Sequence, residues 1–230
     1  MTIHFHEIIH TVPGREEAYM PAITAIGRHY YVLAGPGEAQ HYEQLWLFRT
    51  TGASGVWPRV INLWETTGWK QIAHTLALQF TDRRDPFLED WWNRNLHLRR
   101  GGFDRMLLLA PFSPDDAALT REGVKARLFL HEIVHVPFGE ARTYLAELER
   151  TFLPAAKRHG WQLIGAYRVA LRPREVLTIW GLRDWADLAA PLTADEPDLR
   201  AWLDYRNRTV TCSEELILLP ARLNPLGLQE

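Results

Sequence analysis

The chain has almost no cysteine, no long apolar run and no large excess of charge of either sign. One cysteine, Cys212, among 230 residues excludes an internal disulfide framework and a cysteine-rich zinc site. No apolar stretch approaches the roughly 18 residues of a membrane-spanning helix, and the start does not resemble a signal peptide. A net charge of -2 provides neither the basic excess of a nucleic-acid binder nor an acidic tail. We therefore expect a cytoplasmic protein with no nucleic-acid or membrane partner.

Signatures of several enzyme classes are also missing. The glycines within residues 35–37 and 101–102 lack the spacing of a phosphate-binding loop, and no serine or cysteine stands in a nucleophile elbow. Nothing in the sequence therefore requires a nucleotide or a flavin. We expect no organic cofactor, and a haem or a single metal ion is the alternative.

The pattern His-Glu-x-x-His occurs twice, at residues 6–10 and 131–135. On a helix it is a zinc-protease signature, because positions i and i+4 share one face. Both copies instead lie among β-branched and aromatic residues and end at Pro-Gly or Pro-Phe-Gly, which favours strands. On a strand these two positions lie ~13 Å apart, too far for two ligands that each lie ~2 Å from one zinc ion. We therefore expect no zinc protease.

The recurrence of this segment belongs to a longer internal repeat. Residues 60–69 (VINLWETTGW) match residues 176–185 (VLTIWGLRDW), and residues 85–92 match residues 196–203. Each copy indicates the order strand, helix, strand, strand, helix, strand, which is the ferredoxin-like arrangement. We expect a first ferredoxin-like repeat at residues 1–112, a linker at residues 113–126 and a second repeat at residues 127–230.

A four-stranded sheet with both helices on one face leaves its other face bare, so two such sheets can cover each other. With the Pro-Gly turn at residues 13–14 and the run RRGGFDRMLLLAP at 99–111, the sequence resembles the dimeric α/β-barrel superfamily, and within it the NIPSNAP group. The second repeat departs from that run, with TCSEELILLPA at 211–221. The resemblance implies an α+β fold whose two sheets form a barrel within one chain, as a monomer or a homodimer.

Strand parity places the histidines inside this barrel. His6 and His10 share the less apolar face of the first strand, and His131 and His135 share the equivalent face in the second repeat. On the third strand of each repeat, aliphatic residues occupy alternate positions and suit the face that the helices cover. The residues between them should therefore face the barrel interior. We expect the histidines to line a cavity together with Asn62, Trp64, Thr178 and Trp180.

Glu7 and Glu132 are acids in the middle of otherwise apolar strand faces. A buried carboxylate needs a partner or must take up a proton. Arg49 and Arg168, at matched places on the second strands, are candidate partners. The structural interpretation is a salt bridge or a hydrogen-bond anchor, and the functional interpretation is a general base with a raised pKa.

These features favour a small-molecule enzyme of the isomerase, cyclase or monooxygenase type, in which the barrel cavity holds an apolar or aromatic molecule. Histidine transfers protons near neutral pH. The candidate catalytic residues are His6, His10, His131, His135, Glu7 and Glu132. The superfamily that the sequence resembles includes cofactor-free monooxygenases, polyketide cyclases, isomerases and haem-binding enzymes. The fold alone does not indicate which of these functions the chain has. A non-catalytic binder of a ligand or partner, and a metal or haem protein using a barrel histidine, remain alternatives.

Overall fold

Eight strands close into a single antiparallel barrel in the order β1-β3-β2-β8-β5-β7-β6-β4. The computed structural model describes residues 2–34, 42–82, 84–193 and 195–228. Repeat one comprises β1 (Ile3–Thr11), α1 (Glu16–Ala34), β2 (Tyr42–Thr50), β3 (Arg59–Thr66), α2 (Trp69–Phe80), α3 (Pro86–Asn95), a 3-10 turn (Leu96–Leu98) and β4 (Arg99–Leu109). The predicted ferredoxin-like order is confirmed, and the first His-Glu-x-x-His copy lies on a strand.

Repeat two has the same order with a more divided first helix. It comprises β5 (Leu128–His135), α5 (Ala141–Glu147), a π-helical turn (Leu148–Phe152), α6 (Leu153–Arg158), β6 (Gln162–Val169), β7 (Glu175–Leu182), a 3-10 turn (Trp185–Leu188), α7 (Ala190–Thr193), α8 (Pro197–Thr209) and β8 (Cys212–Pro220). The second His-Glu-x-x-His copy is also a strand. Within the described part of the chain, no helix has the length and apolar character needed to cross a bilayer.

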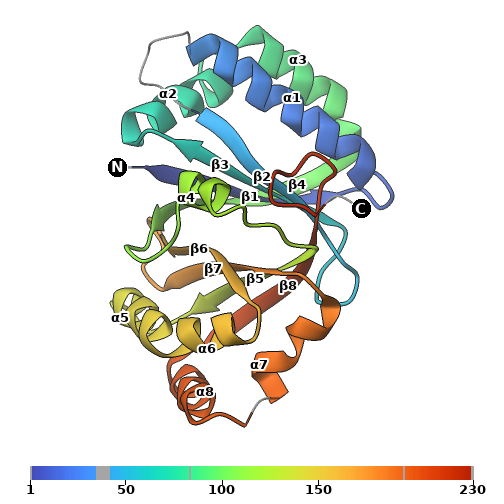
Figure 1. Cartoon of the computed structure of the whole chain (residues 1–230). Helices are drawn as coiled ribbons and strands as arrows, with labels where there is room; N and C mark the ends of the chain where they lie inside the picture. The colour runs from blue at the N-terminus through green and yellow to red at the C-terminus, as the bar shows by residue number, and fades with distance from the viewer. Residues whose placement is uncertain (1, 35–41, 83, 194, 229–230) are drawn as a thin grey trace.

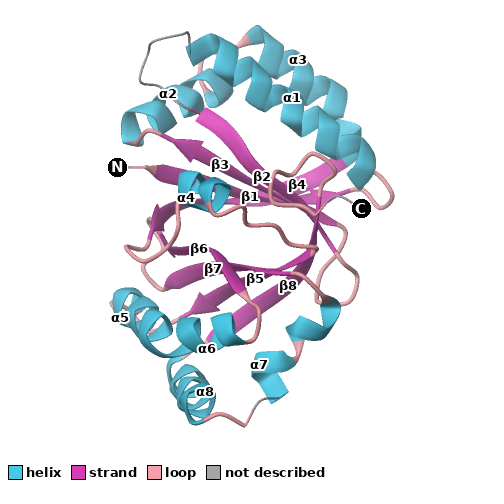
Figure 2. Ribbon diagram, in the orientation of Figure 1, coloured by secondary structure: helices cyan, strands magenta, loops and turns pink. Residues whose placement is uncertain are grey.

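The two sheets face each other, and the helices lie outside. Figures 1 and 2 show α1, α2 and α3 over the outer face of the first sheet, and α5, α6 and α8 over the outer face of the second. Pairing of β2 with β8 and of β4 with β6 joins the sheets along both edges. Because every strand has a partner on each side, the barrel leaves no sheet edge open among the described strands.

Apolar side chains from both repeats fill the space between the sheets. This interior core includes Ile8, Phe48, Ile61, Leu63, Phe129, Ile133, Leu177, Ile179, Leu216 and Leu218. The linker between the repeats takes part, because α4 (Asp116–Arg121) contributes the buried Leu119 to the same core. A segment whose composition is mostly polar therefore contributes Leu119 and Ala126 to the core, and Figure 1 shows α4 between the two sheets at the side of the barrel.

The predicted faces of β3 and β7 are wrong. Asn62 lies opposite Glu7 in the register of β1 and β3, and Leu63 lies opposite His6. Since directly opposed residues of an antiparallel pair share a face, Asn62 points toward the helices and not into the barrel. The same holds for Trp64, Thr178 and Trp180. Both strands are buried on both faces, so apolar content alone could not decide which face is the inner one.

Candidate functional site

In repeat one, Glu7 is surrounded by hydrogen-bond donors on the helix-covered face of the sheet. Its Oε2 accepts hydrogen bonds from Asn62 Nδ2 at 3.0 Å and from Trp64 Nε1 at 2.7 Å. Asp104 of β4 lies directly opposite Glu7 in the strand register. Burial raises the pKa of Glu7 to about 7 and the charge of Asp104 adds to this, while the two hydrogen bonds and Arg99 partly offset it. This carboxyl group can therefore hold or release a proton near neutral pH.

Arg99 and Tyr19 complete the surroundings of Glu7. The guanidinium of Arg99 lies over the ring of Trp92, with its carbon 3.3 Å from the ring centroid. Burial lowers the pKa of Arg99, and the nearby phenol of Tyr19 and the carboxyl of Glu7 partly counteract that effect. Burial and the charge of Glu7 together raise the pKa of Tyr19 well above its ordinary range. Tyr19 thus stays a neutral hydroxyl beside the acid at any physiological pH.

Repeat two has Glu132 in the matching place, with different hydrogen-bond partners and a different cation. Glu132 Oε2 accepts a hydrogen bond from Thr178 Oγ1 at 3.1 Å. Its Oε1 accepts from Arg206 Nε at 3.2 Å and Nη2 at 2.7 Å. Arg206 Nη2 also donates to Glu215 at 2.5 Å. Burial opposes the charge of Arg206, but Glu132 outweighs it and raises the pKa of the guanidinium above its ordinary value.

The sequence missed Arg206, and the predicted arginine partners lie elsewhere. Arg49 Nη1 lies 3.4 Å from Glu17 Oε1 in an exposed pair. Arg168 stands on β6 opposite Leu108 and Val176. The cation that Glu132 contacts comes from α8, 74 residues further along the chain. No periodicity links such distant positions, so only the packing of α8 on the sheet reveals the pair.

A cavity of about 390 Å³ opens beside Glu132 and Arg206, and we call it the repeat-two cavity. It lies between the sheet of repeat two and its helices. Its lining residues are Ser54, Leu130, Glu132, Phe152, Trp161, Trp180, Leu188, Trp202, Leu203, Arg206, Glu215 and Ile217. The volume falls in the range of roughly 300–1,000 Å³ found for small-molecule sites, which are mostly apolar with a few fixed polar groups.

Aromatic rings form much of the wall of this cavity. Phe152 meets Trp180 edge to face with centroids 5.2 Å apart, and it stacks on Trp202 at 5.4 Å. Phe152 is the last residue of the π-helical turn between α5 and α6, and such turns often occur at functional sites. Trp161 is fixed from behind, because its Nε1 donates to Asp187 O at 2.7 Å. The result is a slot with aromatic sides and an ionic end.

The loop between β2 and β3 of repeat one reaches this cavity in repeat two. Thr51 N donates to Ile217 O at 2.9 Å, and Ile217 N donates to Ser54 Oγ at 2.6 Å. The corresponding connection of repeat two, between β6 and β7, is shorter. One repeat therefore supplies part of the wall of the other repeat's cavity.

Inside the barrel, His6 and His131 face each other across the two repeats. Their Nε2 atoms are 2.9 Å apart, and the rings stack at 5.0 Å between centroids with 12° between planes. Neither side chain is exposed. Burial lowers the pKa of both rings, that of His131 to about 3, and the charge of Arg105 lowers both further. At neutral pH both are uncharged, so one ring donates the hydrogen bond and the other accepts it.

The other two predicted histidines lie at the barrel end. His10 is exposed, and His135 Nε2 lies 3.9 Å from Glu175 Oε1. The placement of His6 and His131 inside the barrel is confirmed, but the four histidines do not converge on one point. None of them lines the repeat-two cavity. The prediction that they share a wall with the tryptophans is wrong, because β3 and β7 turn Trp64 and Trp180 to the opposite face. Their catalytic role stays a prediction.

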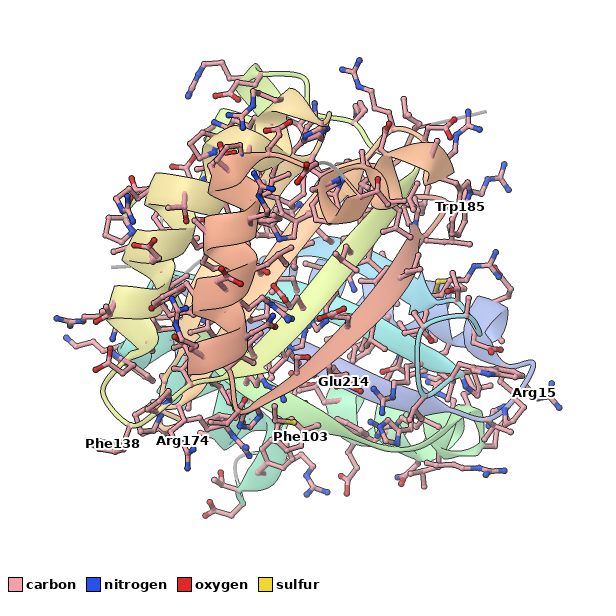
Figure 3. All side chains as sticks on the ribbon, turned by 90° about the horizontal axis from the view of Figure 1, so that it is seen from below. Arg15, Phe103, Phe138, Arg174, Trp185 and Glu214 are labelled. Atoms are coloured by element: carbon pink, nitrogen blue, oxygen red, sulfur yellow. The ribbon has the colours of Figure 1, made fainter. Side chains whose placement is uncertain are left out.

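Two ion pairs connect the repeats near this end. Arg105 Nε donates to Glu175 Oε2 at 2.8 Å, and Arg59 Nη1 donates to Glu214 Oε1 at 2.6 Å. Figure 3 shows Glu214 toward the same end of the strands as Phe138 and Arg174, with Trp185 at the opposite end. Among the described residues, no group of three or more His, Cys, Asp or Glu side chains is arranged to hold a metal ion.

Comparison with solved structures identifies the fold. An anthrone oxidase-like protein superposes with a TM-score of 0.65 at 9% identity, over 96% of this chain and 92% of the other. A candidate monooxygenase from Fusobacterium nucleatum superposes with a TM-score of 0.59 at 7% identity, over 95% and 92%. The chain has the dimeric α/β-barrel fold. The predicted resemblance to this fold is thus confirmed, with both halves of the barrel in one chain.

Other matches cover less than half of the chain. A NIPSNAP family protein from Agrobacterium tumefaciens matches 43% of this chain and 97% of its own length, at 22% identity and a TM-score of 0.39. No family model matches the sequence, and no curated protein matches it.

Proposed function

We propose that this dimeric α/β-barrel protein is an enzyme that binds a planar aromatic small molecule in the repeat-two cavity and removes a proton from it with Glu132. One observation carries the proposal. A half-buried carboxylate, Glu132, and a half-buried arginine, Arg206, lie together at the end of a cavity of about 390 Å³ whose sides are aromatic. A flat ring system fits between such walls, and aromatic pairs prefer offset or edge-to-face contact.

The ionic end of the cavity suits proton abstraction. Glu132 takes the proton from an acidic C–H or O–H of the ligand and becomes a neutral acid, and the electron pair stays on the ligand. Arg206 donates to Glu132 in the resting site, so neutralising Glu132 leaves that guanidinium available to the new anion. Glu215 holds Arg206 in place during this change. A fixed cation near a developing negative charge is the usual means of stabilising such a transition state.

The cavity walls and the structural neighbours support a class of substrate. Full-length structural neighbours are described as an anthrone oxidase-like protein and as candidate monooxygenases. Anthrones are planar aromatic ketones with an acidic methylene group, which is the kind of proton that Glu132 would remove. We place the chain among enzymes that form a carbanion or enolate from an aromatic ketone, the step shared by isomerases, cyclases and cofactor-free monooxygenases.

Proton exchange on anthrone tests the proposal without requiring any oxidation. The rate of deuterium incorporation at the methylene group is measured by NMR under anaerobic conditions in D₂O and compared with the uncatalysed rate. We expect catalysis by the wild type and a loss of about 100-fold or more in Glu132→Gln, the scale of general base catalysis. Glu7→Gln is the matched control, because it removes the equivalent carboxylate of repeat one and should retain exchange.

Binding is followed separately through tryptophan fluorescence. Leu203→Trp fills the repeat-two cavity and should abolish anthrone binding, while far-ultraviolet circular dichroism shows whether each variant is folded. Catalysed exchange that survives in Glu132→Gln would refute the role of this residue. Tight binding without any catalysed exchange would instead identify a non-catalytic binding protein.

A further inference from the structure

A second and larger cavity lies between the linker and repeat two. Its volume is about 660 Å³, again within the range of roughly 300–1,000 Å³ of small-molecule sites. We call it the linker cavity. Its lining residues are Phe112, Pro114, Ala118, Leu119, Glu122, Val124, Leu153, Lys157, Gly160, Trp161, Gln162, Leu163 and Arg183. Trp161 also lines the repeat-two cavity, so the two cavities share this residue.

The walls of the linker cavity are fixed by hydrogen bonds within and between its segments. Ala166 N donates to Ser113 Oγ at 2.9 Å, which ties the start of the linker to β6. Val124 N donates to Leu119 O at 3.0 Å and closes the end of α4. Together with the bond that holds Trp161, these contacts give the cavity a preformed shape.

The floor of the cavity is apolar. Leu119, Trp161 and Leu163 are buried beneath it, with exposed fractions of 1%, 3% and 7%. Phe112 and Val124 are partly buried and line its sides. An apolar ligand bound here would remove these partly exposed surfaces from water. Burial of apolar surface is the main source of binding free energy for an apolar ligand.

Two cations stand at the rim of this apolar floor. Lys157 comes from α6 and Arg183 follows β7, and both are exposed. In the part of the chain that the structure describes, neither takes part in an ion pair. The next residue on α6 shows the contrast, because Arg158 is bound by Glu196 and by Asp198, each at 2.5 Å. One acid, Glu122, lines the cavity as well, so the charged lining has a net positive charge.

We infer that the linker cavity is a binding site for an amphipathic monoanion, an apolar organic acid whose carboxylate contacts Lys157 and Arg183. Its apolar body lies on Leu119, Trp161 and Leu163. Arginine and lysine form charge-assisted hydrogen bonds with carboxylates, which are stronger than neutral ones. This site is separate from the Glu132 carboxylate and does not depend on the function proposed for the repeat-two cavity.

A matched series of probes with one alkyl chain tests the inference. Binding of decanoate, decanol and decylamine to the full chain is measured by isothermal titration calorimetry below their critical micelle concentrations. We expect one saturable decanoate site per chain, with decanol bound roughly tenfold more weakly because it lacks the charge. Decylamine should bind more weakly still, because Lys157 and Arg183 repel it. Equal affinities for the acid and the alcohol would overturn the anion site.

Variants place the site. Ala118→Phe fills the linker cavity from α4 and should abolish decanoate binding, whereas Ala117→Phe adds the same ring to the exposed side of that helix and should not. Lys157→Met and Arg183→Met should each weaken binding by roughly fivefold to tenfold. The control Arg142→Met removes an exposed cation of α5 outside the cavity and should have no effect.

Two results would overturn the inference. One is the absence of saturable decanoate binding to the folded wild-type protein. The other is decanoate binding that Leu203→Trp removes and Ala118→Phe does not, because the probe would then occupy the repeat-two cavity.

Discussion

The two repeats place a glutamate at the same point of the same strand and surround it differently. In repeat one, Glu7 is held by the neutral donors Asn62 and Trp64 beside the acid Asp104. In repeat two, Glu132 is held by an arginine that also binds the neighbouring acid. The comparison shows that duplication kept the acid, while its charge environment changed.

A single position explains why the space between the first helix and the sheet tryptophan differs between the two repeats. The alignment that pairs Tyr19 with Tyr144 also pairs Gly27 with Phe152. At Gly27, a Cβ atom would lie 3.1 Å from Trp64 Cζ3, so α1 lies directly on the indole. At Phe152, a ring stands between the helix and Trp180, and the π-helical turn accommodates it. Repeat one is closed over its tryptophan, and repeat two has an aromatic slot.

Fusion of the repeats also allowed matched positions to take opposite charges. The alignment that pairs Trp64 with Trp180 places Arg59 at the position of Glu175. In a symmetric dimer of identical chains, such positions carry the same residue. Here each one forms an ion pair across the repeats, Arg59 with Glu214 and Glu175 with Arg105. These pairs favour association of one half with the other over association of two like halves.

The largest change in stability that we predict comes from breaking one of these ion pairs between the repeats. Glu175 and Arg105 are 5% and 8% exposed at their side chains. Burial alone would raise the pKa of Glu175, but hydrogen bonds and charges from Arg105 and Arg172 lower it. Glu175→Gln leaves the buried Arg105 uncompensated and should lower the free energy of unfolding by about 3 kcal/mol, measured by urea denaturation at pH 7.

An exposed ion pair is the control for that measurement. Glu147 binds Arg150 on the surface of repeat two, and the arginine side chain is 71% exposed. Glu147→Gln should change the free energy of unfolding by less than about 1 kcal/mol. Similar losses in the two variants would contradict the importance of burial and of the crossing geometry.

Much of the fold could be predicted from the sequence because it depends on short-range patterns. β-Branched and aromatic residues followed by Pro-Gly indicate a strand end whether the motif is His-Glu-x-x-His or not, and recurrence at matched spacing reveals the two repeats. Strand parity then placed His6 and His131 correctly, because β1 and β5 each have a clear difference between faces. These signals lie within a few residues of the features they predict.

The site could be predicted only in part, because it depends on register and on distant contacts. The faces of β3 and β7 are both buried, so the side chain of Asn62 could be assigned only from its pairing with Glu7. Arg206 meets Glu132 through the packing of a helix that the sequence alone does not orient. Phe152 reaches the cavity through a π-helical turn, which the regular helical period does not indicate.

The next prediction concerns Phe152, the ring that repeat two has where repeat one has a glycine. Phe152→Ala removes the contacts with Trp180 and Trp202 and should lower the free energy of unfolding by about 2 to 3 kcal/mol, measured by urea denaturation. It should also enlarge the repeat-two cavity and strengthen binding of aromatic ketones bulkier than anthrone. Phe138→Ala is the control, because that ring is 79% exposed and its loss should have almost no effect. Equal destabilisation by both variants would refute the packing role.

From the buried pair of His6 and His131 inside the barrel, we predict that the protein loses stability in acid. The folded-state pKa of His131 is about 3, below the value of 6.5 for the free side chain, so the unfolded chain binds more protons between these values. The contribution of the neutral His131 ring to the free energy of unfolding is therefore complete above pH 6.5 and is lost as the pH falls toward about 3. At pH 5 the loss amounts to about 2 kcal/mol for this one ring. Urea denaturation of His131→Gln and wild type at pH 7.5 and pH 5 should show a shallower loss in the variant. Parallel curves would contradict a neutral buried ring.

The smallest predicted effect has the opposite sign and lies in repeat one. Burial and Asp104 raise the pKa of Glu7 from 4.5 to about 7, so the folded chain binds more protons than the unfolded chain between these values. The contribution of Glu7 is complete below pH 4.5 and is lost as the pH rises through about 7. Glu7→Gln stays neutral and should become more stable relative to wild type as the pH rises from 5 to 6, by about 1 kcal/mol. Glu132→Gln should instead be less stable than wild type, since removing its carboxylate leaves the half-buried Arg206 without this partner. A relative gain in both variants would mean that the two repeats hold their acids in the same way, despite their different neighbours.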